Sequence, residues 1–493
     1  MCFPGAGPAA DPVCDAGADP VADPMGTALT VTVTAPASAP VTTPVAQWLE
    51  ELAGLLAAEP GVIGVRLLGS MARGEEAGAW VDGSWQCFSD IELLVVTRGR
   101  MAAARRAELA RRASSLAAGW GQRSPLFHVD LLLRERSRLK SLPPFIFTHE
   151  LREAGRTLAG PELRPEIRAV GMANLDRRNT REILFKRLWH LAEALPADWL
   201  RGRPLGELAA RGLAVGLARQ SLDLPTALLP EIGVLAAGYA ARQAAWRAAD
   251  PPFAPLLAEW LGRDPSVYLL DCLERRRRGE PSVDPGAGYR GAVAVLAGGL
   301  SWLADRDEPA DRREPADRDL LLAAATAGAA TAITADGEGD PSGDPLLGRL
   351  DLLAARLPAL SHRLFNERAV TPGERLALAR QSVRLAYTLG PAGAWRWWRA
   401  PRKGHLAAGL LRLHAAGLAL LAGRAADAAA FLAAARVDLA RAHGDWSPAA
   451  APALPADAVD AWLAVRREAG RAFWRVARLG APGSWRDLEA RLR

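Results

Sequence analysis

Three acidic side chains interrupt apolar runs that otherwise have the composition of buried β-strands. Asp90 and Glu92 open the run Asp-Ile-Glu-Leu-Leu-Val-Val, and Asp130 lies inside Phe-His-Val-Asp-Leu-Leu-Leu. Alternate residues of a strand share a face, so Asp90 and Glu92 are expected to point the same way. Neighbouring carboxylates raise each other's pKa unless a cation lies between them, and a buried unpaired carboxylate is costly. The pattern therefore predicts a site for a divalent cation such as Mg²⁺, which prefers carboxylate and phosphate oxygens.

A glycine–serine pair precedes these acids in the chain. The apolar run Val-Ile-Gly-Val-Arg-Leu-Leu stops at Gly69-Ser70. Glycine allows close approach of the backbone to a ligand because it has no Cβ, and successive N–H groups in a turn can hold an anion. The residue types thus indicate a phosphate site beside the predicted cation site.

The three motifs, taken in order, resemble those of the nucleotidyltransferase superfamily. They are Gly-Ser-Met-Ala-Arg-Gly-Glu, then Asp-Ile-Glu-Leu, then Val-Asp-Leu. This is the fold shared with DNA polymerase β and the aminoglycoside nucleotidyltransferases. The resemblance covers about residues 50–165, where Glu-Leu-Arg-Glu-Ala-Gly-Arg-Thr-Leu-Ala-Gly also resembles the segment that closes the domain in bacterial members.

The resemblance implies a role for each acid. Asp90 and Glu92 would hold two Mg²⁺ ions, with Mn²⁺ as the alternative. Asp130 would bind the catalytic ion and help to deprotonate the acceptor hydroxyl. His128, two residues earlier on the same strand face, would either tune this site or, as we favour, form a hydrogen bond at the edge of the sheet.

The resemblance also implies the residues that bind the nucleotide. Gly69, Ser70 and Arg73 would contact the phosphates of a nucleoside triphosphate such as ATP. Family members often add a basic residue from the helical domain that follows. Lys186, in the segment Asn-Leu-Asp-Arg-Arg-Asn-Thr-Arg-Glu-Ile-Leu-Phe-Lys, is the candidate for this role.

Two features depart from the family pattern. The second acid is Glu92 where Asp is commoner, and the gap between Ser70 and Asp90 is longer than usual. The gap contains Ala-Gly-Ala-Trp-Val-Asp-Gly-Ser-Trp-Gln-Cys-Phe, and an Asp-Gly pair between apolar residues is typical of a hairpin turn. We predict an inserted β-hairpin that forms a wall or flap beside the site. Trp80 and Trp85 would either stack on a base or sugar or, as we favour, pack the hairpin.

The elements that must position these residues follow from hydrophobic periodicity. The pattern predicts a helix near residues 45–60, a strand to 68, a second strand from 89, a helix over 101–121 and a third strand near 126–135. A short helical or extended piece, a turn near Ala154-Gly155 and a last strand follow. After Pro161 the chain is Ala/Leu/Arg-rich with helical spacing.

This organisation predicts an α+β fold: a small mixed β-sheet nucleotidyltransferase domain with flanking helices, followed by mostly α-helical C-terminal regions. The ranges are a disordered tail over 1–44, the nucleotidyltransferase domain over 45–165, a helical domain over 166–305, a flexible linker over 306–345 and a second helical domain over 346–493. The linker repeats Glu-Pro-Ala-Asp-Arg and continues into a Gly/Asp-rich stretch, both typical of unfolded connections.

Bulk composition limits the class of protein. The 493 residues are 50% hydrophobic with a formal net charge of +6, and the basic residues are nearly all arginine. The four cysteines form no CxxC pair, which favours a reducing compartment without disulfides or zinc. The sequence shows neither a signal peptide nor a membrane span. We therefore expect a soluble cytoplasmic protein.

Two basic clusters suggest nucleic-acid binding, but we favour a structural explanation for each. Arg275–Arg278 could bind phosphate backbones, but arginines also suit the C-terminal end of a solvated helix. Residues 394–405 interleave three tryptophans with basic residues, as in single-strand binding, but are better explained as a helix end packed in the core.

The predicted reaction is transfer of a nucleoside monophosphate from a nucleoside triphosphate to an acceptor hydroxyl. The acceptor stays open among a small molecule, an RNA end and a protein. The alternatives are a catalytically inactive nucleotide-binding regulator and an antitoxin-like protein nucleotidyltransferase. The Ala/Leu faces of the helical regions would serve a homodimer or enclose the acceptor.

Overall fold

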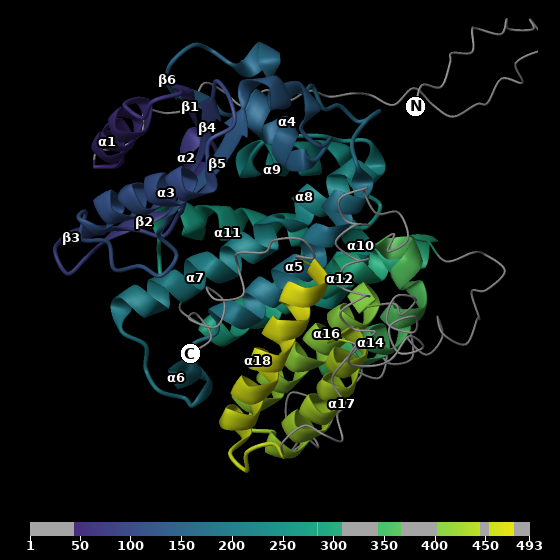
Figure 1. Ribbon diagram of the computed structural model, residues 1–493. Coiled ribbons are helices and arrows are strands. Elements are labelled where there is room, and N and C mark those ends of the chain that lie inside the picture. Colours follow the sequence, from purple (N-terminus) through teal and green to yellow (C-terminus); the bar gives the residue numbers. More distant parts are fainter. Residues whose placement is uncertain (1–43, 283, 308–343, 366–401, 444–452, 478–493) are drawn as a thin grey trace, which may run out of the picture.

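The computed structural model of the chain describes residues 44–282, 284–307, 344–365, 402–443 and 453–477 (Figure 1). An α/β domain is followed by a larger helical unit, so the fold is α+β with a small mixed sheet and mostly helical C-terminal regions. The predicted tail and most of the predicted linker lie outside the described residues, as does the tryptophan-rich stretch before Arg402.

The α/β domain is built on a four-stranded sheet with the order β5-β4-β1-β6. β1 (Val62–Leu67) pairs antiparallel with both β4 (Ile91–Thr97) and β6 (Arg156–Ala159). β4 pairs parallel with β5 (Val129–Glu135), and in that register Glu92 lies opposite Asp130. The predicted strands are therefore present, and two of the three predicted acids lie side by side on adjacent strands.

The sheet is buried on both faces because β4 is almost continuously apolar after Glu92. Leu93 and Val95 pack in one hydrophobic cluster with residues of α1 (Val45–Ala57) and α3 (Ala103–Ala118). Leu94 and Val96 pack in another with Leu151 of α4 (Ile146–Glu153). Each fully buried side chain of this size stabilises the fold by roughly 1.5–3 kcal/mol, which holds β4 rigidly beneath the acids at its start.

The predicted inserted hairpin is confirmed. β2 (Gly78–Val81) and β3 (Ser84–Cys87) pair antiparallel across a turn at Asp82 and Gly83. Both turn residues have positive φ, 51° and 74°, which Asp and Gly tolerate and most residues do not.

The predicted position of this hairpin as a wall of the site is wrong. Its residues Ala79 and Val81 pack instead with Val215 of the helical unit, and the cavity described below has no hairpin residue in its lining. Trp80 is 66% exposed and meets the ring of Trp85 edge-on with ring centroids 6.1 Å apart. Both tryptophans belong to the hairpin's own packing, which was the favoured alternative.

The helical unit begins after the α/β domain and continues through both helical regions expected from the sequence (Figure 1). One hydrophobic core joins residues from Leu184 to Val476, so the helices on either side of the predicted linker share a single core. In the part of the chain that the structure describes, its α-helices are α5 (Arg177–Ala194), α6 (Ala197–Leu200), α7 (Glu207–Leu222), α8 (Leu224–Leu228), α9 (Tyr239–Ala249), α10 (Ala254–Leu261), α11 (Pro265–Arg278), α12 (Pro285–Asp307), α14 (Pro345–Leu364), α16 (Arg402–Leu421), α17 (Ala425–His443) and α18 (Ala458–Ala477).

The helix α16 lies at the centre of this core. It is the one helix among the described residues that is long and apolar enough to cross a membrane, but 78% of its apolar window is buried within the protein. That environment is the one a core helix has in a soluble protein. His414 of α16 accepts a hydrogen bond from the Tyr289 hydroxyl at 2.8 Å and contacts the Leu188 carbonyl at 2.8 Å, which links α16 to α12 and α5.

Complete burial lowers the pKa of His414 to about 4, and this gives the core a pH dependence. The unfolded chain binds a proton near the ordinary histidine pKa of roughly 6.5, whereas the folded protein does not until about pH 4. Stability contributed by the neutral ring is therefore present above the unfolded pKa and is lost as the pH falls toward the folded pKa.

We predict that His414 contributes about 2 kcal/mol to the loss of unfolding free energy between about pH 7.5 and pH 4.5. His414→Gln is expected to be less stable than the wild type at neutral pH but to lose less stability on acidification. Urea denaturation of both proteins at the two pH values measures the difference. Equal losses in the two proteins would contradict the prediction.

Candidate active site

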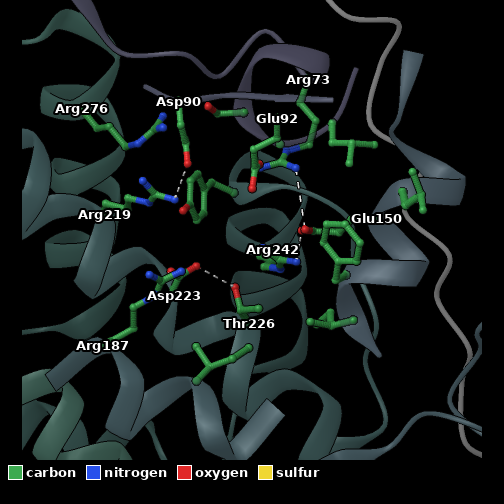
Figure 2. A pocket seen from close by; sticks show the side chains of 18 of the residues that line it. Arg73, Asp90, Glu92, Glu150, Arg187, Arg219, Asp223, Thr226, Arg242 and Arg276 are labelled. Atoms are coloured by element: carbon green, nitrogen blue, oxygen red, sulfur yellow. Dashed lines mark hydrogen bonds and ion pairs between the residues drawn. The ribbon is translucent and has the colours of Figure 1, made fainter. Parts of the chain in front are cut away.

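A cavity of about 230 Å³ lies where the α/β domain meets the helical unit (Figure 2). The turn after β1, the start of β4 and the helix α4 line it from one side, and α5, α7, α9 and α11 line it from the other. Five arginines face four carboxylates there. The charged lining residues are Arg73, Asp90, Glu92, Glu150, Arg187, Arg219, Asp223, Arg242 and Arg276.

The turn after β1 depends on glycine. Gly69 begins the short helix α2 (Gly69–Ala72) with a φ of +65°, a conformation that side chains disfavour. A Cβ at this position would lie 1.9 Å from Oε2 of Glu92. The absence of a side chain therefore lets the Glu92 carboxylate lie directly against the turn, and Ser70 follows in the lining of the same cavity. The sequence predicted that a phosphate would approach this turn closely. In the structure the Glu92 carboxylate makes the close approach.

Asp90 and Glu92 both line the cavity, as the alternation predicted. Burial disfavours the ionised form of Asp90, but the Arg219 guanidinium, 3.5 Å from Oδ2, and His128 outweigh it, so the pKa of Asp90 lies below its usual value. Burial, and after it the charge of Asp90, raises the pKa of Glu92 to about 7. Asp90 is thus ionised at neutral pH, whereas Glu92 keeps its proton until the pH approaches 7. A bound cation would stabilise the ionised form of both carboxylates.

Asp130 lies beside Asp90 but outside the cavity. Its side chain is 63% exposed, and Nε2 of His128 lies 3.3 Å from its Oδ2 and 4.0 Å from Oδ2 of Asp90. One ligand atom from each of these three residues lies within 4.8 Å of the others, a spacing that could hold a metal ion. His128 therefore pairs with Asp130 at the edge of the sheet, as the favoured interpretation expects, and it also lies 4.0 Å from Asp90.

The oxygen-rich donor set fits a hard divalent cation. Asp90 and Glu92 offer carboxylate oxygens to the cavity. Asp90 also belongs to the cluster with His128 and Asp130 that has the spacing of a metal site, and Glu92 is not part of that cluster. Mg²⁺ and Mn²⁺ suit carboxylate ligands, and the imidazole of His128 is better matched to Mn²⁺ than to Mg²⁺.

The helical unit supplies one cavity arginine from each of four helices, and the sequence did not identify these residues as a group. Arg187 lies 2.5 Å from Asp223, Arg219 reaches Asp90, and Arg242 pairs with Glu150. Arg276 donates to the Glu75 carbonyl and to the Ser89 hydroxyl, and its Nε has no hydrogen-bond partner. Arginines dispersed from Arg187 to Arg276 carry no motif, so only the packing of the helices reveals them.

The reading of Arg275–Arg278 as a solvated helix end is wrong for Arg276. The side chain is 3% exposed and lines the cavity. Burial lowers the pKa of Arg276. Its neighbours Arg275 and Arg278 are exposed at the helix end, as the helix-end interpretation expects.

Two predicted phosphate contacts, Arg73 and Lys186, differ in position. Arg73 lines the cavity, where it pairs with Glu75 at 2.7 Å and lies 3.8 Å from Glu150. Lys186 does not line the cavity, and its Nζ lies 3.1 Å from Glu182 one turn away. The next residue, Arg187, lines the cavity instead. The helix that carries Lys186 therefore reaches the cavity, but it does so through Arg187.

Glu75 joins the two halves of the site. Its buried carboxylate accepts hydrogen bonds from the backbone N–H groups of Tyr239 and Ala240, at 3.1 and 2.9 Å. It also forms an ion pair with Arg73. Those N–H groups are at the start of α9, where a helix leaves donors without partners. A residue of the α/β domain therefore caps a helix of the helical unit, and this fixes the cavity's two walls relative to each other.

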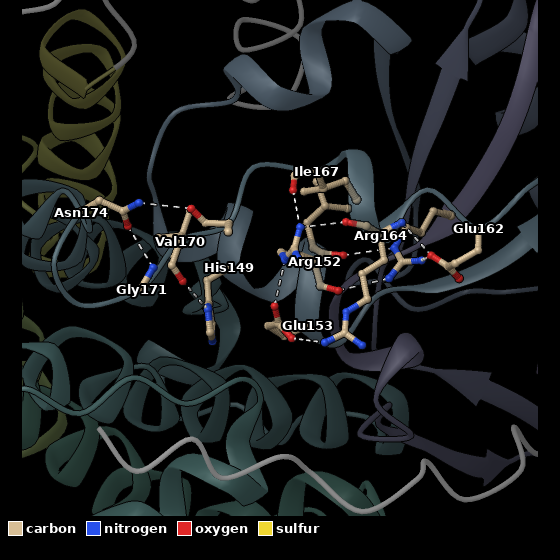
Figure 3. Close-up of polar contacts among 12 residues, drawn as sticks. His149, Arg152, Glu153, Glu162, Arg164, Ile167, Val170, Gly171 and Asn174 are labelled. Carbon is tan, nitrogen blue, oxygen red and sulfur yellow. Dashed lines mark hydrogen bonds and ion pairs between the residues drawn. The ribbon is translucent and has the colours of Figure 1, made fainter. Parts of the chain in front are cut away.

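Polar contacts, shown in Figure 3, also fix α4. This helix carries Phe147 and Glu150 to the cavity. Nδ1 of His149 lies 3.0 Å from the Val170 carbonyl, and Arg152 donates to the Ile167 carbonyl at 2.6 Å. Arg164 pairs with Glu153 at 2.5 Å. These contacts bind the segment after β6 onto α4 and so hold one wall of the cavity in place.

The arrangement can hold a divalent cation at one edge and a polyphosphate between the cation and the arginines. No protein-family model, curated protein or solved structure matches this chain. The case for a function therefore rests on the geometry of the cavity.

We predict that Gly69→Ala displaces the Glu92 carboxylate and weakens binding of Mn²⁺ or Mg²⁺ at least about tenfold. Gly83→Ala is the matched control, because Gly83 has a φ of +74° but nothing within 4 Å of the added Cβ. Both variants should lose about 1 kcal/mol of stability from the strained φ. Calorimetric titration with each cation measures affinity, and equal affinity in the two variants would contradict the role given to Gly69.

We further predict that cation affinity rises with pH until about pH 7, because the cation must displace the proton that Glu92 carries below its raised pKa. Affinity should fall roughly tenfold for each pH unit below that value. Titration in buffers of different ionisation enthalpy counts the proton released. Glu92→Gln is expected to bind more weakly at high pH and to lose this slope, and an unchanged slope would assign the proton to another group.

Proposed function

We propose that this chain is a nucleotidyltransferase that moves a nucleoside monophosphate from a nucleoside triphosphate to an acceptor hydroxyl. The observation that carries the proposal is the convergence of Gly69-Ser70, the carboxylates Asp90 and Glu92 and several arginines on one cavity. The cavity is smaller than the roughly 300–1,000 Å³ of pockets that enclose a whole small ligand, so it suits the phosphates rather than the complete nucleotide.

Each wall has a part in binding the triphosphate. The Ser70 hydroxyl and the backbone of the turn would donate to terminal phosphate oxygens, and Arg187, Arg219 and Arg276 would neutralise their charge from the opposite wall. The Arg219 guanidinium contacts Asp90. Cations bound to Asp90 and Glu92 would neutralise these carboxylates, so the guanidinium would be available to a phosphate. Arginine suits this position because its planar group binds phosphate oxygens in pairs.

Asp130 would act on the acceptor from the exposed side of Asp90. In the proposed reaction the acceptor oxygen forms a bond to the α-phosphorus, the bond from that phosphorus to the pyrophosphate oxygen breaks, and pyrophosphate leaves. The acceptor proton goes to the Asp130 carboxylate, which His128 orients at 3.3 Å. Two bound Mg²⁺ ions would supply charge stabilisation at the attacking and leaving oxygens. Asp90 and Glu92 would hold them.

The second candidate is a nucleotide-binding regulator without turnover. Two observations favour it: Arg219 lies against Asp90, and Asp130 lies outside the cavity. A regulator would bind nucleotide with a cation but release no pyrophosphate.

A further alternative is that the acceptor is itself a protein, as in antitoxin-like enzymes. The transferred label would then be found on protein.

We predict label transfer when the purified protein, Mg²⁺ and each α-labelled nucleoside triphosphate are added in turn to a lysate of the source organism. Asp90→Asn should reduce transfer by roughly 100-fold or more, because it removes charge that stabilises the reacting phosphate. Asp82→Asn, a matched change at the exposed hairpin turn, should transfer label like the wild type. Circular dichroism on both variants confirms that each is folded.

The fraction that carries the label identifies the acceptor class among small molecules, RNA and protein. Absence of label with every nucleotide, in a protein that binds the nucleotide with Mg²⁺, would reject the transferase and support the regulator. Absence of both binding and transfer would reject both candidates.

A further inference from the structure

A second cavity, of about 570 Å³, lies within the helical unit. The helices α7, α10, α11 and α12 enclose it, together with the turn between α11 and α12. Its volume lies within the roughly 300–1,000 Å³ of pockets that bind small organic molecules. It shares no lining residue with the first cavity, and no residue of the proposed transferase site belongs to it.

The interior of the second cavity is apolar and partly aromatic. Small residues, Ala218 on α7 and Gly291 on α12, keep the space between the helices open, and the rings of Trp260 and Tyr268 line it. A Cβ on Gly291 would lie 2.8 Å from the Tyr268 ring, so glycine is what allows this ring its position. The Tyr268 hydroxyl is held by Ser221 at 2.8 Å. The Arg263 guanidinium lies over the Tyr268 ring, 4.6 Å from the ring centroid, so an aromatic ring and a positive charge adjoin in this cavity. A planar apolar ligand suits the space beside these rings.

The rim of the cavity carries a surplus of positive charge on one side. Arg263 and Arg275, whose side chains are 45% and 44% exposed, lie 3.6 and 4.0 Å from the same carboxylate, Asp271. One acid therefore serves two guanidinium groups. The other acids in the lining are engaged elsewhere: Glu280 lies 3.7 Å from Arg278, and Asp284 accepts from a backbone N–H at the start of α12 at 3.0 Å.

A third rim arginine, Arg290, is already paired. Its guanidinium makes two hydrogen bonds to Asp344, at 2.6 and 2.5 Å. The lining as a whole carries three arginines and three acids and so has no net charge, but Arg263 and Arg275 share the single carboxylate of Asp271. This favours a ligand with one anionic group, held at the rim while its apolar body lies against the rings.

The two cavities adjoin different faces of the same pair of helices. On α7, Ala218 lines the second cavity and the next residue, Arg219, lines the first. On α11, Arg275 lines the second cavity and the next residue, Arg276, lines the first. The helices α7 and α11 also pack against each other. Because this helix pair separates the two spaces, a ligand in the second cavity cannot be the acceptor, but a shift of either helix changes the position of a phosphate-facing arginine.

We propose that the second cavity binds a small organic anion, an aromatic body with one carboxylate, sulfonate or phosphate group, and that its occupancy changes the nucleotide affinity of the first cavity through α7 and α11. The binding half of this inference stands on the second cavity by itself. The regulatory half rests on the proposed function.

The first experiment titrates the full-length protein with 8-anilinonaphthalene-1-sulfonate and follows its fluorescence. Saturable binding to one site per chain is expected, weakened at least about tenfold in Arg275→Gln and in Ala287→Trp, which fills the cavity from its exposed edge. Arg277→Gln is the matched control at the same helix end, because Arg277 is exposed and does not line the cavity, and it should bind like the wild type. Non-saturable fluorescence, or equal affinity in Arg275→Gln and Arg277→Gln, would overturn the site.

A second titration tests the charge of the ligand. 2-Naphthoate should displace the dye at least about tenfold better than its neutral analogue 2-naphthamide, because only the acid can pair with the rim arginines. Equal displacement by the two compounds would show an apolar cavity without selection for an anion and would overturn the stated ligand class.

The third titration repeats the dye measurement with saturating Mg²⁺-ATP, after calorimetry has established that the nucleotide binds. Linkage requires the same factor in both directions, so a several-fold change in dye affinity is expected if the helices couple the sites. Bound nucleotide without any change in dye affinity would overturn the regulatory half. Failure of every nucleoside triphosphate to bind would reject the proposed function and the regulatory half with it, while the first two titrations still decide the binding site.

Discussion

The structure depends on the neutralisation of carboxylates that are buried where the two halves of the chain meet. Glu75, Asp90 and Glu92 lie on the α/β domain at positions with little access to water, where an unpaired charge is destabilising. Much of the compensating charge comes from the helical unit, chiefly from Arg219, whose strongest interaction is with Asp90. The domain and the helices are therefore joined by charge as well as by apolar contact.

Glu75 shows how specific this joint is. A carboxylate that accepts from two backbone N–H groups at the start of α9 can do so in only one orientation of that helix. Gly238, just before α9, has a φ of +93°, and a Cβ there would lie 2.7 Å from Arg73. The close approach of α9 to the turn after β1 thus requires a glycine on one side and an acid on the other. The cavity between the halves is held open by these contacts rather than by loose packing.

The same helices have two roles. α7 and α11 each present an arginine to the acids of the α/β domain and small or apolar side chains to a larger space behind. In an ordinary amphipathic helix the face opposite the core is solvated. Here α7 is buried over most of its length, and the hairpin packs against it at Val215. This explains why Ala218 and Arg219, adjacent in sequence, contribute to different cavities.

The sequence by itself determined the local features. Strand alternation placed Asp90 and Glu92 on the same side of the strand. Gly69-Ser70 marked the turn, and Asp-Gly between apolar residues marked the hairpin. These signals are local because they depend on steric rules within a few residues. It did not determine which arginines reach the acids, why Arg187 rather than Lys186 faces the cavity, that Arg276 is buried, or that Asp130 lies outside the cavity. Only the tertiary structure decided these points, because the rotation of a helix about its axis and the separation of two strand edges are fixed by packing between residues far apart in the chain, and no local pattern encodes that packing.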